Sequence, residues 1–154
     1  MNIAIVGATG NVGRKTLEVI QKKKLSFNEL YLVASSKSAG AKINFNGKDY
    51  EVLNLENFDF SKVKIAFFAA GGKVSKKFAE KAAKSCLVID NSSYFRMDPD
   101  VPLIVPQVNS NHLKNIKKNC QQHLRYYLIY SMIVLDMLVH QAQQLLAQIK
   151  LKVL

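Results

Sequence analysis

The chain has 154 residues, of which 49% are hydrophobic, enough for one domain of ordinary size with its own core. Its two cysteines, Cys86 and Cys120, are too few for a disulfide framework or a zinc site, and no metal is expected. The net charge of +11 favours anionic partners. Because the lysines are scattered without interleaved aromatics, we expect solvated faces and no nucleic-acid partner. The N-terminus has no leader pattern, which predicts a cytoplasmic protein.

The first predicted element is a strand over residues 3–6, followed by a glycine turn. The run is apolar without polar alternation, which is typical of a strand buried on both faces of a parallel sheet. Three glycines spaced three apart follow it, and the residues after them have helical periodicity. Gly7 would permit the tight turn, Gly10 would let a pyrophosphate approach, and Gly13 would let the helix pack closely. This turn predicts nucleotide binding at a helix N-terminus, with a purely structural turn as the alternative.

The second predicted strand, residues 29–34, runs into the loop of residues 35–40. Folds that bind NAD place an acid near this strand end to accept the ribose 2′-OH. The loop has no acid and instead offers Ser35, Ser36, Lys37 and Ser38, all able to donate to a 2′-phosphate. The loop therefore predicts NADP as the cofactor, and the alternative is a serine-rich loop with a solvated lysine.

The middle of the chain predicts a hairpin and two further buried strands. Residues 43–53 alternate around Asn46-Gly47, a strong turn dipeptide. A buried strand over 63–70 precedes a helix over 73–84, and another strand follows over 86–90. In that last strand Cys86 is expected to be a small buried hydrophobe.

Loops rich in glycine and serine follow these strands, at residues 7–13 and 35–40 and at 71–72 together with 91–93. The carboxyl ends of parallel strands share one edge, where open α/β sheets bind ligands. The sequence therefore predicts an α/β, Rossmann-like fold, with a mostly parallel sheet, helices on both faces and a ligand site at that edge.

Five segments carry a family resemblance by their order and spacing. They read Gly-Ala-Thr-Gly-Asn-Val-Gly (7–13), Ser-Ser-Lys-Ser-Ala-Gly (35–40), Phe-Ala-Ala-Gly-Gly (68–72), Asp-Asn-Ser-Ser-Tyr-Phe-Arg-Met (90–97) and Pro-Leu-Ile-Val-Pro-Gln-Val-Asn (102–109). Over about residues 1–119 the chain resembles the N-terminal domain of bacterial aspartate-semialdehyde dehydrogenase. N-acetylglutamyl-phosphate reductase shares the glycine turn but fits residues 91–97 less well.

The resemblance implies NADPH-dependent reductive dephosphorylation of L-aspartyl 4-phosphate to L-aspartate 4-semialdehyde through a cysteine thioester. This reaction belongs to lysine, threonine, methionine and diaminopimelate biosynthesis, and the family enzymes are homodimers. By position, the residues implied for cofactor binding are Gly7, Thr9, Gly10, Asn11, Val12, Gly13, Ser35, Ser36, Lys37, Ser38, Ala70 and Gly71.

For the substrate, the resemblance implies Asn91 and Arg96, with Arg96 on the phosphate group. A guanidinium suits that role because its N–H groups fork onto phosphate oxygens. The alternative is a surface arginine paired with Asp98 or Asp100.

The resemblance weakens at Cys120, where only the Asn-Cys pair of the family's nucleophile motif is present. Cys120 is thus a provisional nucleophile, and His123 beside it is not taken as its base. The family's general base, substrate-orienting glutamine and second substrate arginine belong to a second domain that has no match here. We expect an NADP-binding domain over residues 1–119, a non-family tail over 120–154, and a truncated chain that is inactive alone.

The tail contains a very apolar stretch over residues 124–139 that predicts a helix packed on the domain or on a partner. It is shorter than the roughly 20 apolar residues of a spanning helix and includes Asp136, so no membrane segment is expected. A disordered tail is the alternative. Two other functions remain open: an interaction module that uses this tail, or another small NADP-dependent reductase. The latter would need a Tyr-x-x-x-Lys pair, and no tyrosine here has one.

Overall fold

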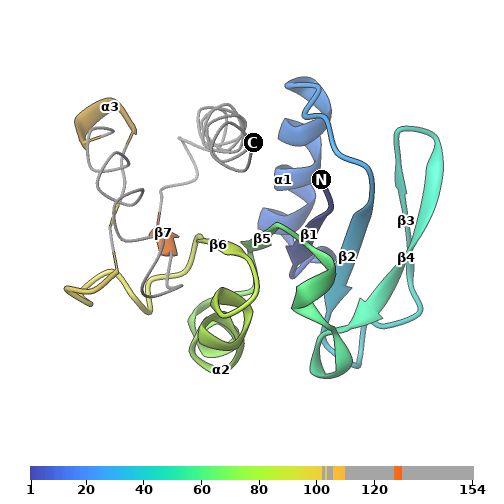
Figure 1. The fold of residues 1–154 in the computed structure, drawn as a ribbon. Helices are drawn as coiled ribbons and strands as arrows, with labels where there is room; N and C mark the ends of the chain where they lie inside the picture. The colour runs from blue at the N-terminus through green and yellow to red at the C-terminus, as the bar shows by residue number, and fades with distance from the viewer. Residues whose placement is uncertain (102, 104–105, 110–126, 130–154) are drawn as a thin grey trace, which may run out of the picture.

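A computed structural model describes residues 1–101, 103, 106–109 and 127–129 of the chain. Within these residues the fold is one seven-stranded sheet with the strand order β3-β4-β2-β1-β5-β6-β7 (Figure 1). Every neighbouring pair is parallel except the antiparallel β3–β4 hairpin. The strands are β1 Ile3–Val6, β2 Leu30–Ala34, β3 Lys42–Phe45, β4 Lys48–Asn54, β5 Ile65–Phe68, β6 Leu87–Asp90 and β7 Tyr127–Ile129.

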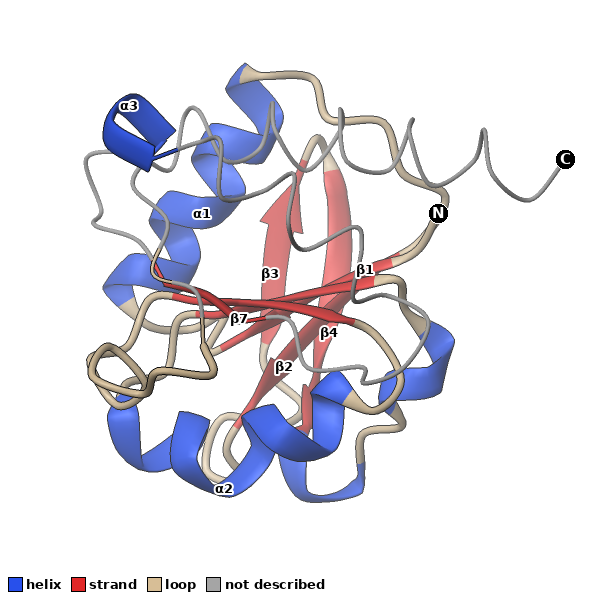
Figure 2. Cartoon of the chain, turned by 60° about the vertical axis from the view of Figure 1, so that its left-hand side comes forward, coloured by secondary structure: helices blue, strands red, loops and turns tan. Residues whose placement is uncertain are grey.

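Helices cover both faces of the sheet, as the sequence predicts. Helix α1 (Asn11–Lys22) lies on one face and α2 (Gly72–Ala83) on the other (Figure 2). Alternate residues of the fully buried β1 supply the two cores: Ile3 and Ile5 belong to the α1 side, and Ala4 and Val6 to the α2 side. The other helical segments within the described residues are the 3₁₀ turns η1 (Leu55–Asn57) and η2 (Phe60–Lys62) and the four-residue α3 (Pro106–Asn109).

The hairpin forms where the dipeptide Asn46-Gly47 predicts it. Both residues have left-handed backbone, with φ of 53° and 77°, as a two-residue type I′ turn requires. Phe45 at the end of β3 is buried, and its ring centroid lies 6.2 Å from that of Phe27. The hairpin therefore extends the sheet and closes the core beside the end of α1.

Several element boundaries differ from the sequence prediction by one or two residues: β2 begins at Leu30, β5 covers Ile65–Phe68 and α2 covers Gly72–Ala83. Helix α1 begins at Asn11 and so includes Gly13, because the turn closes early: the Gly10 N–H donates to the Gly7 carbonyl at 3.0 Å. Cys86 lies just before β6, where it is buried as predicted and its Sγ donates to the Ala82 carbonyl at 3.4 Å.

Only three residues of the apolar stretch 124–139 are described, and they form a strand instead of the predicted helix. Strand β7 pairs with β6 in parallel, with Ile89 opposite Leu128. Tyr-Leu-Ile favours a strand, and β6 would otherwise present an unpaired edge. The remaining stretch and the division at residues 119–120 lie outside the described residues. Among the described helices, none combines the length and the apolar character needed to cross a membrane.

Candidate nucleotide-binding site

The loops that follow β1, β2, β5 and β6 lie at one edge of the sheet, as the sequence predicts. Parallel pairing places the carboxyl ends of these strands side by side, with Val6 opposite both Val33 and Phe68. Backbone bonds continue the ladder one residue further, from Gly7 N–H to Val33 O at 2.7 Å, Ala69 N–H to Val6 O at 2.8 Å and Asn91 N–H to Phe68 O at 3.0 Å. The first residues of the loops are therefore held in fixed positions.

The three glycines of the turn have different surroundings. Gly7 has a φ of +86°, and a Cβ there would lie 2.8 Å from the Ala70 Cβ, so the turn packs directly on the loop after β5. A Cβ on Gly13 would lie 2.2 Å from the Gly7 carbonyl oxygen. Gly10 is exposed, and among the described residues a Cβ there would meet only that same oxygen, at 3.4 Å. Gly7 and Gly13 are thus required by the protein's own packing, whereas Gly10 leaves an open surface for a ligand.

The N-terminus of α1 is prepared for an anion. Its N-cap is Gly10, which offers no side-chain cap, and the first turn carries no acid. Arg14 N–H bonds the Gly10 carbonyl at 2.9 Å, but no such bond is formed within the described residues by the N–H groups of Asn11, Val12 or Gly13. Unpaired N–H groups and the helix dipole together favour a phosphate at this position.

The loop after β2 is tied to the glycine turn. The Thr9 hydroxyl donates to Ser38 Oγ at 3.4 Å, and Ser38 N–H bonds the Ser35 carbonyl at 2.9 Å. Ser35, Ser36 and Lys37 are exposed. Lys37 forms no ion pair with any described residue, so its ammonium is available to an anion.

The loop after β5 brings a second helix N-terminus to the same edge. Gly71 is the N-cap of α2 and has a φ of +80°, with open space where a Cβ would be. No side chain of a described residue caps this helix end either. Ala70, against Gly7, and Gly71 therefore lie beside the glycine turn.

The two residues that the resemblance implies for the substrate are brought together by the loop after β6. Arg96 is exposed, and its Nη2 donates to the Asn91 carbonyl at 3.5 Å. The alternative pairing with Asp98 or Asp100 is not formed, and the Asp98 carboxylate instead accepts the Asp100 N–H at 3.0 Å. The guanidinium therefore has donors left for an anion.

Sequence reasoning missed Asp90, the last residue of β6. It is fully buried, and its carboxylate accepts the Ser75 hydroxyl at 3.0 Å, the Ser92 N–H at 2.8 Å and the Ser92 hydroxyl at 2.8 Å. Burial raises the pKa of Asp90 above 3.8, and the bonds from Ser92 and Ser75 and the charge of Arg96 oppose that rise. The pattern of Asp90 two residues before Ser92, at the end of a strand, predicts the local turn. It does not predict the contact with α2.

The raised pKa of Asp90 predicts a pH dependence of stability. Between 3.8 and the raised value the folded chain binds more protons than the unfolded chain, so this residue's contribution is present at low pH and lost as pH rises. Asp90→Asn cannot titrate. The free energy of unfolding of the natural chain minus that of Asp90→Asn should therefore increase as pH falls from 7 toward 4 in urea titrations. A constant or decreasing difference would contradict this assignment.

The provisional nucleophile Cys120 and its neighbour His123 lie outside the described residues. Cys86 is unsuited to that role because burial raises the pKa of its thiol to about 12. No cluster of three metal-ligating side chains occurs within the part of the chain that the structure describes.

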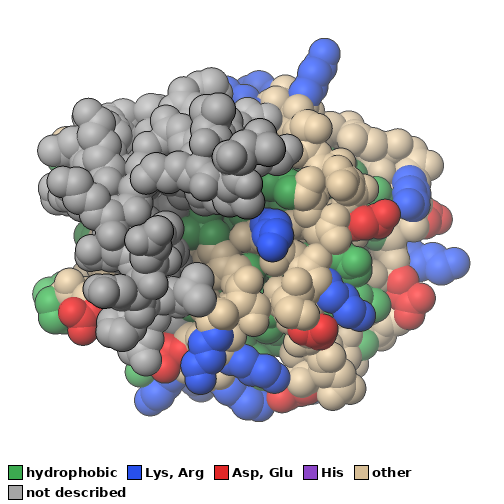
Figure 3. Space-filling view, viewed as in Figure 1, with side chains coloured by type: hydrophobic (Ala, Val, Ile, Leu, Met, Phe, Trp, Pro, Cys, Tyr) green, Lys and Arg blue, Asp and Glu red, His purple; other side chains and the backbone are tan. Residues whose placement is uncertain are grey.

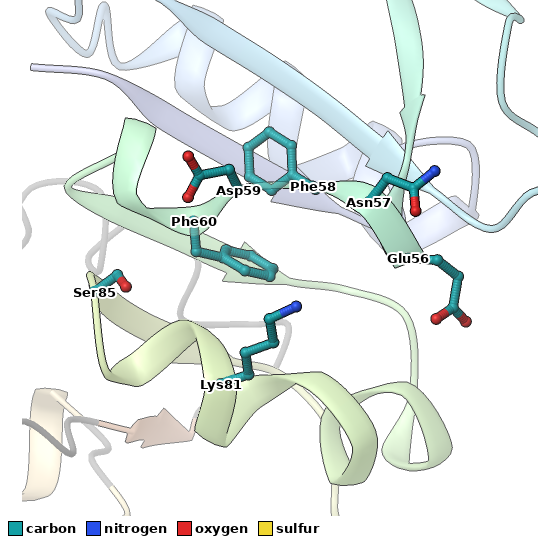
Figure 4. A pocket seen from close by; sticks show the side chains of 7 residues that line it. All are labelled: Glu56, Asn57, Phe58, Asp59, Phe60, Lys81 and Ser85. Carbon is teal, nitrogen blue, oxygen red and sulfur yellow. The ribbon is translucent and has the colours of Figure 1, made fainter.

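Two surface hollows lie away from the sheet edge. One of about 430 Å³ is lined by η1, η2 and the end of α2, including Phe60 and Lys81 (Figure 4). The other, of about 460 Å³, lies between the end of α1 and the hairpin. On the face shown in Figure 3, lysine and arginine side chains are interspersed with acidic and apolar ones. Neither hollow collects the convergent donors that the sheet edge offers, so the edge is the candidate site.

A parallel sheet whose first strand passes through a glycine turn into an uncapped helix defines a dinucleotide-binding domain of the Rossmann type. Comparison with known proteins makes the assignment specific. The family model for the semialdehyde dehydrogenase NAD binding domain matches residues 2–116, and the chain belongs to this family.

The relatives of the chain are aspartate-semialdehyde dehydrogenases. Those of Rickettsia bellii and Aquifex aeolicus are 48% and 52% identical over 115 and 119 residues, which are 74% and 75% of this chain. A crystal structure of aspartate semialdehyde dehydrogenase II from Vibrio cholerae, complexed with ASA, superposes with a TM-score of 0.77 and 43% identity. The superposition covers 89% of this chain and 44% of the Vibrio cholerae chain. The chain spans about a third of the length of the two curated relatives.

Proposed function

We propose that this chain is the NADP-binding part of an aspartate-semialdehyde dehydrogenase. The observation that carries the proposal is the pairing of two loops at the sheet edge: the glycine turn, and the loop of residues 35–40 bonded to it through Thr9 and Ser38. The first offers free N–H groups for a pyrophosphate, and the second offers Lys37 with no carboxylate. That combination suits a dinucleotide with a 2′-phosphate.

Each loop has a separate task in this proposal. The N–H groups of Asn11, Val12 and Gly13 hold the pyrophosphate, while Lys37 and the hydroxyls of residues 35, 36 and 38 hold the 2′-phosphate. Ala70 and Gly71 lie beside the nicotinamide ribose, where the absence of a bulky side chain lets the ring approach. A dinucleotide held in this way would supply a hydride for reduction.

At the substrate end, we propose that Arg96 and Asn91 bind the phosphate of an acyl phosphate and that Cys120 is the provisional nucleophile. The sequence departs from the family pattern after residue 119, and no general base is assigned in this chain. Since turnover needs the base and the substrate clamp positioned together, we expect this chain to bind the cofactor without turning over. The biosynthetic pathway and the homodimer stay predictions from the resemblance, and the cytoplasmic location stays a prediction from the sequence.

The test is a fluorescence titration of the purified chain with NADPH, with NADH measured beside it. Saturable binding that prefers NADPH is expected, and a parallel assay with aspartate semialdehyde, phosphate and NADP should show no turnover. Equal affinity for the two nucleotides would refute the 2′-phosphate site, and absence of binding to either would refute the proposed function. Turnover by this chain would refute the proposed separation of binding from catalysis.

A further inference from the structure

The loop that carries Arg96 is attached to the first half of α2 at three points. A Cβ built on Gly72 would lie 3.5 Å from the Tyr94 Cβ, so backbone and loop are in contact there. The Lys76 ammonium lies 5.5 Å from the centre of the Tyr94 ring. The third point is the buried bond from the Ser75 hydroxyl to Asp90.

Of these three attachments, the one at Asp90 fixes the geometry most narrowly. Its carboxylate joins Ser75 on α2 to both the N–H and the hydroxyl of Ser92, and all three residues are buried. The Ser92 hydroxyl oxygen in turn accepts the Tyr94 N–H at 3.3 Å. These bonds therefore fix the path of the loop from Asp90 as far as Tyr94, two residues before Arg96.

We propose that Asp90 is a positioning residue that holds the anion-binding loop 91–96 on α2. Burying a carboxylate costs free energy even when it is hydrogen-bonded, so the residue is better explained by the geometry it fixes than by stability. One oxygen of the Asp90 carboxylate accepts the bond from Ser75 on α2, and the bonds from Ser92 in the loop go to both oxygens.

The consequence is a link between the two halves of the site. Helix α2 begins at the loop of residues 70–72, proposed to lie beside the nicotinamide ribose, and the loop 91–96 carries the guanidinium proposed to bind the substrate phosphate. The inference therefore rests on the proposed function for the role of each loop. It adds that Asp90 and Ser75 determine where Arg96 is presented relative to the cofactor.

The test follows inorganic phosphate binding to the NADPH-saturated chain by NMR, using the Arg96 Nε–H and the amides of residues 91–96. Asp90→Ala should weaken phosphate binding about tenfold or more, and Ser75→Ala about threefold. Asp90→Asn should retain most of the affinity, because an amide oxygen in place of Oδ1 still accepts the Ser92 N–H and the Ser75 hydroxyl, and the Ser92 hydroxyl can rotate to accept an amide N–H. NADPH affinity should stay within about twofold for every variant, since the Asp90 carboxylate is bonded to Ser75 and Ser92 and not to the glycine turn.

Asp59→Ala is the matched control. Asp59 accepts the Ser61 N–H at 2.9 Å in a turn of the same kind, but it lies at η2, away from the sheet edge. It should leave phosphate binding unchanged. If Asp90→Ala does not fold, Ser75→Ala and Asp90→Asn decide the matter.

Unchanged phosphate affinity in Ser75→Ala and Asp90→Ala would overturn the inference, as would a natural chain whose loop does not respond to phosphate. A parallel loss of NADPH and phosphate binding would also overturn it, because that pattern indicates general unfolding instead of loop positioning. Failure of the natural chain to bind NADPH would instead refute the proposed function, and the titration of the unloaded chain with phosphate still tests the loop.

Discussion

Gly13→Ala is expected to lower the free energy of unfolding by about 3 kcal/mol, the upper part of the usual range for overpacking. A Cβ at this position would lie 2.2 Å from the Gly7 carbonyl oxygen and 2.8 Å from the Ala8 Cα. Both atoms belong to backbone that is bonded to β2, so neither can move without disturbing the sheet. Urea unfolding of the purified variant measures the change.

The sign of this effect is informative because Gly13 is inside α1. In an unobstructed helix interior, alanine would stabilise the chain by about 1 kcal/mol relative to glycine. A neutral or stabilising result would therefore mean that the turn and helix do not pack as closely as described.

Gly10→Ala is the matched control, since it makes the same chemical change three residues earlier in the same turn. Within the described part of the chain a Cβ there meets only the Gly7 oxygen, at 3.4 Å, and the Gly10 φ of −80° is open to any residue. We therefore expect a loss of less than about 1 kcal/mol. The added methyl group would occupy the surface proposed for the pyrophosphate, and NADPH affinity should fall at least about tenfold. The two variants thus separate the glycine that the fold needs from the glycine that the ligand needs.

The elements that could be predicted from sequence are those whose cause is local. The apolar run at residues 3–6, the glycine turn and the Asn46-Gly47 hairpin each depend on residues within a few positions of one another. The position of the loops at one edge of the sheet could also be predicted, because it requires only that the strands be parallel.

The parts that could not be predicted depend on residues distant in sequence. Ser75 and Asp90 are fifteen positions apart, and nothing in either segment specifies that the helix and the strand end meet. Strand β7 is the other case: Tyr127–Ile129 is compatible with a helix or a strand, and pairing with β6 decides between them. In both places the deciding contact joins residues that are distant in sequence.

Lys37→Glu is expected to reduce NADPH affinity about 30-fold or more while changing NADH affinity by less than about threefold. A hydrogen bond to a charged group contributes about 1.5–3 kcal/mol, and the new carboxylate would in addition repel the 2′-phosphate. The two cofactors differ only in that phosphate, so a selective loss locates it at the loop of residues 35–40. Fluorescence titrations of the variant with both nucleotides measure the ratio.

Lys64→Glu controls for the general effect of charge on a basic chain. It makes the same change in net charge at an exposed lysine that precedes β5, at the opposite edge of the sheet. NADPH affinity should change little in this variant, because a distant exposed charge is screened by salt. If both variants weaken NADPH binding equally, the preference for NADPH over NADH arises from the overall electrostatic field of the protein. If Lys37→Glu weakens NADPH and NADH alike, residue 37 lies near a part that both nucleotides share, and the 2′-phosphate must be held elsewhere.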